Sequence, residues 1–448
     1  MAQTLTGTDA SDNPLPADPF GPAIRSQLSS FLTYGVFDPR TFNQTRVASD
    51  FRTDRVQSWS FGIQREIAQN TVVEARYVGN RGDRLFQTIN ANPRVRELVR
   101  DFPDAVPGVT ACTDSTKPGY RRVDCELGVV RLRTNTGYSD YHGLQTELRA
   151  TRIADQLTLR TAFTWSKTTD NVSEIFSTFG AGNTYFASQN PLDYKKAEHG
   201  LSGLDRPHTW QLTLHEEIPA YRDQRGVAGK ILGGWSVSGT YIIASGETYT
   251  PAQFCLSYCS SGVQYYDVTF ANAFIGSFEA ARPFLSNPAA PESFVGIYAG
   301  DACGYFGGDR ECGMPADKLL SLNFFNSHGI ATPTDPSNVR FIVNAPTANG
   351  IYGTPFGSAA RNSLRDAISN VGNFAVYKQT KLTERFTLQW HMSMINVFNH
   401  PNFYSVDPFI DDAGLASEGT GFADPSLFNG TTSSLGQRQI RFGLKLSF

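Results

Sequence analysis

Apolar and polar residues alternate along nine segments of the chain, which is the period of a β-strand with two unlike faces. In the eighth segment, Leu388, Trp390 and Met392 share one face, and Gln389 and His391 share the other. The seventh segment is short and its phase is ambiguous. The segments are residues 56–67, 71–77, 141–152, 157–166, 210–218, 235–243, 374–376, 386–398 and 440–448.

The connections between these segments alternate between short and long. Residues 68–70, 153–156 and 382–385 make three short turns, and about a dozen residues around Pro219 make a fourth. The long loops cover about residues 80–140, 167–205, 246–372 and 400–436. Transmembrane β-barrels have short periplasmic turns and long extracellular loops. We therefore predict an all-β fold, a partial, antiparallel, up-and-down transmembrane barrel of about nine or ten strands, with long extracellular loops.

The order of the segments suggests how the chain is organised. Residues 1–55 look like loop with at most one weak strand, and residues 56–448 look like the C-terminal portion of a barrel. The N-terminus has no basic segment followed by an apolar core, so it does not resemble a secretory signal. Single-chain bacterial barrels have even strand numbers. Because nine is odd, we expect earlier strands, a plug and a signal to be missing from this sequence.

Composition agrees with a membrane wall of strands, and it argues against membrane-spanning helices and against a nucleic-acid-binding protein. No apolar run approaches the roughly 20 residues of a membrane helix, and the mean hydropathy is −0.30. In a barrel only alternate residues meet lipid, so a low average is expected. The net charge is −3, and a nucleic-acid-binding protein would need a basic patch or stripe.

Six cysteines lie in three local pairs within Gly-, Ser- and Asp-rich segments, which favours disulfide-closed loops in an oxidising compartment. The alternative is zinc bound by thiolates, but the tight Cys-x-x-Cys spacing of zinc knuckles is absent. The candidate pairs are Cys112 with Cys125, Cys255 with Cys259, and Cys303 with Cys312.

All five tryptophans fall in the apolar phase of their strands, and several lie near a strand end. Tryptophan is enriched where a membrane meets water, so we predict an aromatic girdle, although the same residues could fill the core of a β-sandwich. The girdle candidates are Trp59, Trp165, Trp210, Trp235 and Trp390.

Seven short motifs, in order over residues 56–448, resemble Oar-like TonB-dependent receptors. They are Ser58 to Glu66 (SWSFGIQRE), Tyr77 to Gly82 (YVGNRG), Tyr141 to Gln145 (YHGLQ), Phe163 to Lys167 (FTWSK), Asp205 to His208 (DRPH), Asn396 to Phe403 (NVFNHPNF) and Arg441 to Phe448 (RFGLKLSF).

The resemblance implies a 22-stranded outer-membrane barrel with an internal plug, which takes up a bulky solute such as a carbohydrate or siderophore through TonB. It also implies that the last strand is recognised by the barrel-assembly machinery. The residues that would carry this signal are Phe442, Leu444, Leu446 and Phe448. The expected partners are therefore outer-membrane lipid, the assembly machinery, TonB through the missing plug, and an unidentified solute.

Enzyme signatures are absent from the sequence, so we predict no catalytic activity, cofactor or metal. There is no Gly-x-Ser-x-Gly, phosphate loop, His-Glu-x-x-His or dinucleotide fingerprint. His215 and Glu217 share a polar face, and we interpret them as a solvated pair rather than as an acid–base site. Acidic residues in two long loops, Asp301 with Asp309 and Asp411 with Asp412, could bind Ca²⁺, although solvated acidic loops are more common. A secreted adhesin or carbohydrate-binding sandwich and a passive porin remain rival interpretations.

Overall fold

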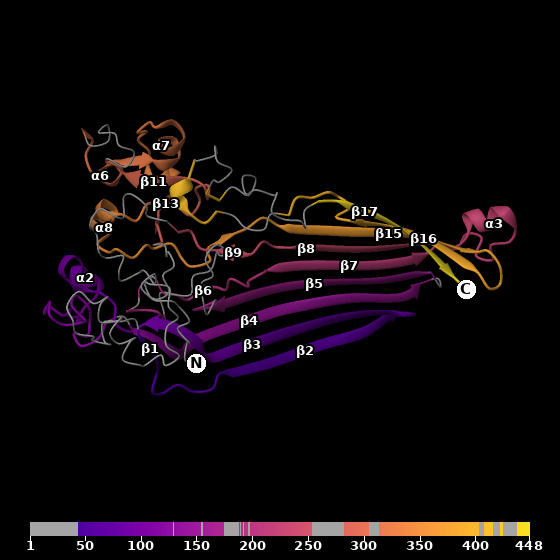
Figure 1. The fold of residues 1–448 in the computed structure, drawn as a ribbon, viewed down its shortest axis with the longest axis horizontal. Coiled ribbons are helices and arrows are strands. Elements are labelled where there is room, and N and C mark those ends of the chain that lie inside the picture. Colours follow the sequence, from indigo (N-terminus) through magenta and orange to yellow (C-terminus); the bar gives the residue numbers. More distant parts are fainter. Residues whose placement is uncertain are drawn as a thin grey trace, which may run out of the picture.

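Nine long strands form the wall of the molecule, and each pairs antiparallel with its neighbour in the order β17-β16-β15-β8-β7-β5-β4-β3-β2 (Figure 1). The computed structural model describes residues 44–128, 130–153, 156–173, 188, 190, 192–195, 198–252, 282–303, 313–402, 407–414, 422–423 and 437–448. The strands of the wall are β2 (Arg55–Ala68), β3 (Thr71–Asn90), β4 (Val130–Ile153), β5 (Leu157–Asp170), β7 (His208–Glu217), β8 (Trp235–Ala244), β15 (Ser369–Lys381), β16 (Thr387–Ile395) and β17 (Gln439–Ser447).

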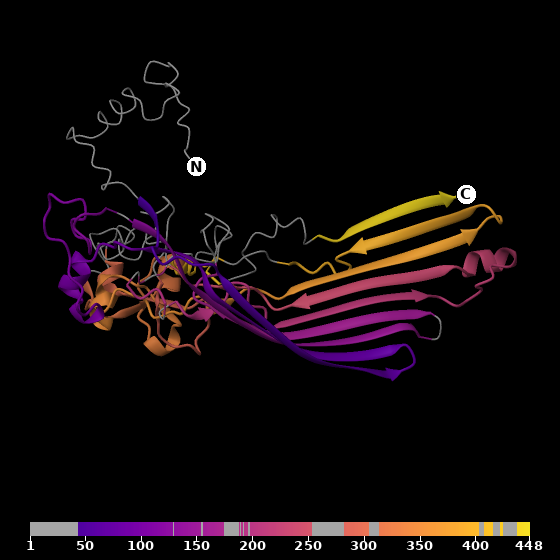
Figure 2. The same ribbon diagram turned by 90° about the horizontal axis from the view of Figure 1, so that it is seen from below.

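Two short strands extend this sheet. β1 (Gln44–Val47) pairs parallel with β4, and it lies in the N-terminal segment where at most one weak strand was expected. β6 (Gly200–Leu201) pairs with the end of β5. The sheet is curved and open, with β2 and β17 as its outer edges (Figure 2). No helix among the described residues combines the length and apolarity needed to cross a bilayer.

The short and long connections lie at opposite ends of the strands, as predicted (Figure 1). One end carries the β2–β3, β4–β5 and β15–β16 turns and the longer β7–β8 turn, which contains α3 (Gly226–Leu232). The other end carries the four long loops. Short turns lie on the periplasmic side of outer-membrane barrels, so we call the two ends periplasmic and extracellular.

Three strands are longer than the sequence pattern predicts. β3 and β4 continue about ten residues past the predicted loop boundaries, to Asn90 and from Val130. The 20 residues of β3 reach about 65 Å, about twice the roughly 30 Å hydrocarbon core of a bilayer. The extension is flanked by loops, so both faces are covered and Gln87 and Thr88 are buried. Without lipid on one face, no apolar alternation marks it. β15, expected as a short segment, has 13 residues.

The long loops fold into small layers with their own core, which we call the extracellular cap (the described residues of 245–368 and 396–423). Its core cluster includes Ile297, Leu320, Phe341, Leu364 and Ile410. The wall is exposed on its faces, so most of the conventional hydrophobic core lies in the cap, and a smaller cluster around Leu98 and Val106 lies in the β3–β4 loop. The cap elements are β9 (Thr248–Tyr249), β10 (Phe284–Leu285), β11 (Val295–Tyr298), α6 (Ala299–Ala302), β12 (Leu319–Ser321), α7 (Leu322–His328), η4 (Pro336–Asn338), β13 (Phe341–Ile342), α8 (Pro346–Tyr352), β14 (Leu364–Arg365) and η5 (Ile410–Asp412).

Candidate functional site in the membrane wall and extracellular cap

The strand register gathers the apolar phase of all nine strands on one face of the sheet. Phe61 lies opposite Tyr77, Tyr77 opposite Leu144, and Leu144 opposite Trp165. Because directly paired residues point to the same side, the row continues across the wall. We call this side the apolar face, and it includes Trp59, Phe61, Ile63, Leu144, Leu148, Leu159, Phe163, Trp165, Trp210, Leu212, Leu214, Trp235, Val237, Tyr241, Ile243, Phe374, Val376, Leu388, Trp390, Met392, Met394, Phe442, Leu444 and Leu446.

The apolar face is open to its surroundings rather than packed. Phe61 is 71% exposed and Leu444 is 70% exposed. Among the described residues, no second sheet covers this face, so the rival sandwich interpretation does not fit. An apolar surface of this extent is a membrane contact surface.

The opposite side, which we call the polar face, carries paired charges. Glu147 accepts hydrogen bonds from both neighbouring guanidinium groups, with Arg149 Nη2 at 2.7 Å from Oε1 and Arg160 Nη2 at 3.0 Å from Oε2. Arg149 and Arg160 are direct cross-strand partners, and the shared carboxylate offsets their repulsion. Within β3, Arg76 pairs with Glu74 of the same strand. Such groups suit a water-filled or plugged lumen.

The five tryptophans form two groups on the apolar face. Trp59, Trp165 and Trp210 lie toward the extracellular ends of their strands, and Trp235 and Trp390 lie toward the periplasmic ends. The ten residues of β8 span about 33 Å, which a strand tilt of about 40° reduces to about 25 Å, the height of an apolar band. This spacing supports the girdle.

Three of these tryptophans are fixed by specific neighbours. The indole of Trp59 lies over Gly79, where a Cβ would approach its ring to 2.2 Å, so glycine leaves the space that the ring fills. Trp235 and Trp390 meet edge to face, with centroids 6.2 Å apart.

The last strand lies at an open edge of the wall. β17 pairs with β16 from Thr387–Ser447 to Ile395–Gln439. The residues expected to carry the assembly signal are exposed on the apolar face or just beyond the strand, and they are Phe442, Leu444, Leu446 and Phe448.

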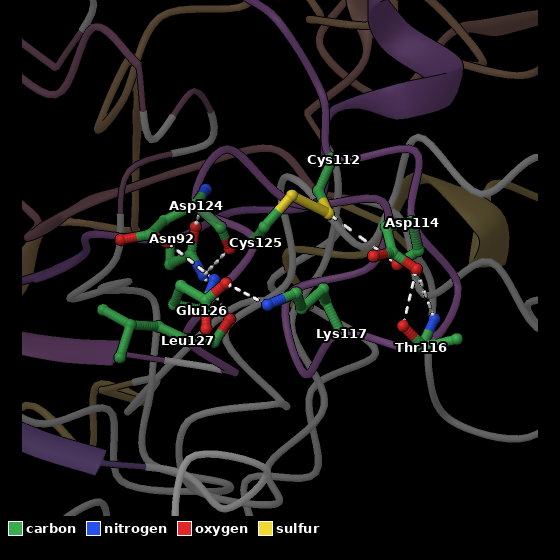
Figure 3. The surroundings of a disulfide bond; sticks show 9 residues. All are labelled: Asn92, Cys112, Asp114, Thr116, Lys117, Asp124, Cys125, Glu126 and Leu127. Carbon is green, nitrogen blue, oxygen red and sulfur yellow. Dashed lines mark hydrogen bonds and ion pairs between the residues drawn. A yellow bond between two sulfur atoms is a disulfide. The ribbon is translucent and has the colours of Figure 1, made fainter.

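A disulfide joins Cys112 to Cys125 in the β3–β4 loop, with Cα atoms 5.1 Å apart (Figure 3). Asn92 stabilises the same loop by donating to the carbonyls of Leu127 at 2.6 Å and Asp124 at 3.1 Å. Cys303 is also disulfide-bonded. Cys255, Cys259 and Cys312 lie outside the described residues.

Replacing both Cys112 and Cys125 with serine should release this loop while leaving the wall intact. Closing a loop of this size is worth about 3 kcal/mol in the chain-entropy account. We expect amide hydrogen exchange to lose about that much protection in residues 112–125, with α8 as an internal reference. Unchanged exchange in the loop would contradict a stabilising role for the bond.

Two of the acidic residues predicted as calcium ligands, Asp301 and Asp411, are buried in the cap, and Asp309 lies outside the described residues. Asp301 is buried and accepts hydrogen bonds from the backbone N–H groups of Thr347 at 2.8 Å and Ala348 at 3.3 Å, so it caps the first turn of α8. Burial raises the pKa of its carboxyl. Asp411 is also buried, and its carbonyl accepts from Asn326. Within the described part of the chain, no group of three potential metal ligands is assembled.

A buried ion cluster holds the cap to the extracellular rim of the wall. Arg361 pairs with Asp170 at the end of β5 and donates to the carbonyl of Glu198 at 3.0 Å and to Ser173 Oγ at 2.7 Å. Arg282 pairs with Glu198 at 2.7 Å. We call Asp170, Glu198, Arg282 and Arg361 the rim cluster. Each of its four side chains is at most 7% exposed.

A second set of contacts continues this attachment along β14. Arg365 pairs with Asp205, which is 1% exposed and also accepts from the backbone N–H of Thr168 at 2.5 Å. Asn362, fully buried, donates to the Leu201 carbonyl at 2.8 Å. Apart from Asp205, which lies in the DRPH motif, no sequence pattern marks these residues, because their partners lie up to 191 residues away along the chain.

A polar pocket of about 580 Å³ lies on the polar face near the periplasmic end. His215, Glu217, Arg222, Tyr377 and Lys381 are among its lining residues. His215 Nδ1 lies 2.9 Å from Ser238 Oγ. The predicted pairing of His215 with Glu217 on one face is consistent with the register, which gives both residues partners on the polar face of β8.

Asp407 is expected to make the cap sensitive to pH. Burial, together with the nearby carboxylates of Asp412 and Asp411, raises the pKa of Asp407 to about 7 from an ordinary value of 3.8. The folded cap therefore favours the protonated form, and this contribution to stability declines as the pH rises from about 4 through 7. Protease cleavage of the cap should increase between pH 5.5 and pH 8.

Asp407→Asn should remove most of this pH dependence. Asp335→Asn is the matched control. A hydrogen bond from Ser337 N–H lowers the pKa of Asp335, so this carboxylate stays ionised over the same pH range. Equal pH dependence in Asp407→Asn and in the unmodified chain would show that another group is responsible.

Sequence comparison identifies the family. The sequence model of the outer membrane beta barrel domain family matches residues 1–441. No curated protein matches the sequence.

Three solved structures illustrate the structural likeness, which concerns the fold alone. The outer membrane transporter YddB from Escherichia coli is 9% identical over 91% of this chain and 33% of its own, with a TM-score of 0.37. The ferripyoverdine receptor of Pseudomonas aeruginosa is 8% identical over 88% and 27%, with a TM-score of 0.33. The FrpB iron transporter from Neisseria meningitidis is 10% identical over 90% and 32%, with a TM-score of 0.33. The chain spans about a third of the length of these proteins or less.

The predicted fold class and location are confirmed. The family match covers nearly the whole chain, and the antiparallel wall has one face suited to lipid and one suited to water. The chain therefore belongs to the outer membrane beta barrel domain family and lies in the bacterial outer membrane.

Proposed function

We propose that this chain forms part of the wall and the extracellular cap of a TonB-dependent receptor that takes up a bulky solute. The proposal gives the chain a role in binding and transport rather than in catalysis. The observation that best supports this role is the attachment of a folded cap to the rim of the wall by the buried rim cluster.

A fixed cap distinguishes a receptor from a passive pore. Loops with their own core and buried ion pairs cannot be displaced at little cost, because breaking one buried pair costs about 3–5 kcal/mol. Such loops present a preorganised surface, which lowers the ordering cost of binding a ligand. A passive porin needs an open aqueous channel instead. The resemblance to Oar-like receptors in seven ordered motifs supports the same proposal.

The cap also presents rings suited to a carbohydrate or siderophore. Phe294 is 47% exposed and Phe324 is 52% exposed. Asn323 joins their segments, because its Oδ1 accepts from Val295 N–H at 2.9 Å and its Nδ2 donates to the Ser293 carbonyl at 2.8 Å. Flat aromatic rings pack against sugar and catechol rings, while nearby polar groups fix orientation.

The open β17 edge suggests how the wall reaches the membrane. We propose that the barrel-assembly machinery recognises the exposed apolar side of this strand, at Phe442, Leu444, Leu446 and Phe448. An exposed strand edge offers unpaired N–H and C=O groups to a pairing strand, which fits a recognition step before closure of the barrel.

Uptake measurements in cells test the function. Cells that carry the protein would be supplied with labelled ferric siderophores and with oligosaccharides too large for general porins, with and without TonB. We expect uptake of at least one solute only when TonB is present, and reduced binding of that solute after Phe324→Ser. Uptake that persists fully without TonB would favour a passive pore and contradict the proposal.

A further inference from the structure

We propose that the β7–β8 turn, residues 218–234, rests on the phospholipid of the periplasmic leaflet and anchors the wall at that surface. The other periplasmic connections in the described chain are only a few residues long, whereas this one contains the helix α3. The location of the chain in the outer membrane puts this turn beside lipid. The proposal does not depend on which solute is transported.

The turn exposes apolar side chains well beyond the end of the strands. Val227 is 77% exposed and Ile231 is 60% exposed, and one helical turn separates them, so they share a face of α3. Leu232 and Tyr221 are exposed beside them. Clustered apolar exposure on a rigid element marks a surface that is covered in the working protein.

Two contacts align this apolar surface with the membrane side of the wall. Trp235 Nε1 donates to the Ile231 carbonyl at 3.0 Å, and the Lys378 ammonium group donates to the Gly233 carbonyl. Trp235 and Lys378 are direct partners in the row of the apolar face that also contains Trp390. The C-terminal end of α3 is therefore continuous with the lipid-facing surface.

The helix α3 lies beyond the ends of β7 and β8 (Figure 1), and specific contacts hold the turn that contains it. Buried Gln224 donates to the Gln379 carbonyl at 2.8 Å and accepts from the backbone N–H of Lys381 at 2.9 Å. Gly234 has a φ of +73°, and a Cβ there would lie 2.2 Å from Gln224 Nε2, so glycine is required for this close approach.

Charge around α3 matches a phospholipid surface. Arg225 and Lys230 lie on the turn with Asp223 as the one acidic residue of 218–234, while Arg222 lines the polar pocket. Lys230 Nζ donates to the Leu382 carbonyl at 3.3 Å. Lys378 Nζ lies 5.6 Å from the centre of the Trp235 ring. Basic side chains that extend toward headgroups, tryptophan at the interface and an apolar helix face are the features of an interfacial anchor.

Spin labels on single cysteines test this arrangement in the full-length protein. Labels at Val227 and Ile231 would be compared with one at Asp223 on the same turn and one at Leu444 on the apolar face. The protein would be placed in vesicles of phosphatidylethanolamine and phosphatidylglycerol, and collision with oxygen and with a water-soluble nickel chelate would be measured.

We expect the labels at Val227 and Ile231 to be shielded from nickel and accessible to oxygen, as at Leu444, while the label at Asp223 meets nickel. Nickel access at Val227 equal to that at Asp223 would overturn the proposal. Shielding that appears only in native membranes and not in pure lipid vesicles would also overturn it, because a protein partner would then cover the helix. Val227→Ser together with Ile231→Ser should restore nickel access at a label on Leu232.

Discussion

Replacing Leu212 with arginine is expected to destabilise the wall by about 2–4 kcal/mol, the cost of a charge on the lipid face near the membrane midplane. Leu212 lies in the middle of β7 on the apolar face, opposite Thr161 and Tyr241. Gln211→Arg, one residue away, is the matched control. Gln211 lies on the polar face opposite Ala162 and Ile242, so we expect a change well below that of Leu212→Arg.

Unfolding by urea in phospholipid vesicles, followed by the shift in migration between folded and unfolded barrel, measures both variants. The two variants are expected to differ in stability because side chains alternate between the two faces of a strand. A side chain and its neighbour point to opposite faces, so one enters hydrocarbon and the other water. Similar losses in the two variants would mean that the two faces do not have the environments assigned to them.

Arg361→Met should detach the cap from the wall. Removing one partner of a buried pair leaves an uncompensated charge and costs about 3–5 kcal/mol. Asp170 would lose its ion-pair partner and keep only the hydrogen bonds from Ser173, and Glu198 would lose the hydrogen bond to its carbonyl. We expect rapid proteolysis within the cap while the wall stays protected. The control Arg206→Met breaks an exposed pair with Glu247 and should cost about 0–1 kcal/mol.

A double variant distinguishes two effects of breaking the pair: the loss of the attraction between the two charges, and the cost of leaving one buried charge unpaired. Arg361→Met combined with Asp170→Leu removes both charges of the closest pair. Since buried pairs are often replaceable by apolar residues, we expect the double variant to resist protease better than Arg361→Met alone. If the double variant were as sensitive as the sum of both single changes, the rim cluster would act through its hydrogen bonds rather than through charge.

The wall was predictable from the sequence because lipid on one side and water on the other impose a period of two. Segments such as β7 and β16 show this alternation without exception over their central residues. β15 does not show a clear alternation, because Lys378 occupies the apolar phase while Ala375 and Tyr377 occupy the polar phase. The Lys378 side chain reaches the Gly233 carbonyl, which is a tertiary contact that no local pattern records.

The cap could not be predicted in the same way. Its core comes from short elements spread over more than one loop, such as Leu320 and Ile410. Asp170, Glu198 and Arg361 each look like ordinary surface charges in sequence. Their burial depends on the loops folding back onto the rim across 163 to 191 positions. Local disulfide pairing was easier to predict, because Cys112 and Cys125 are separated by only 13 positions.

The most direct test of the two-faced wall is the labelling of single cysteines by a hydrophilic thiol reagent in intact outer membranes. The account predicts that cysteines at Leu214, Leu388 and Leu444 are protected, while cysteines at the neighbouring polar-face positions Gln389 and Lys445 react when the lumen is accessible to the reagent. Free labelling at Leu214, Leu388 and Leu444 would contradict it.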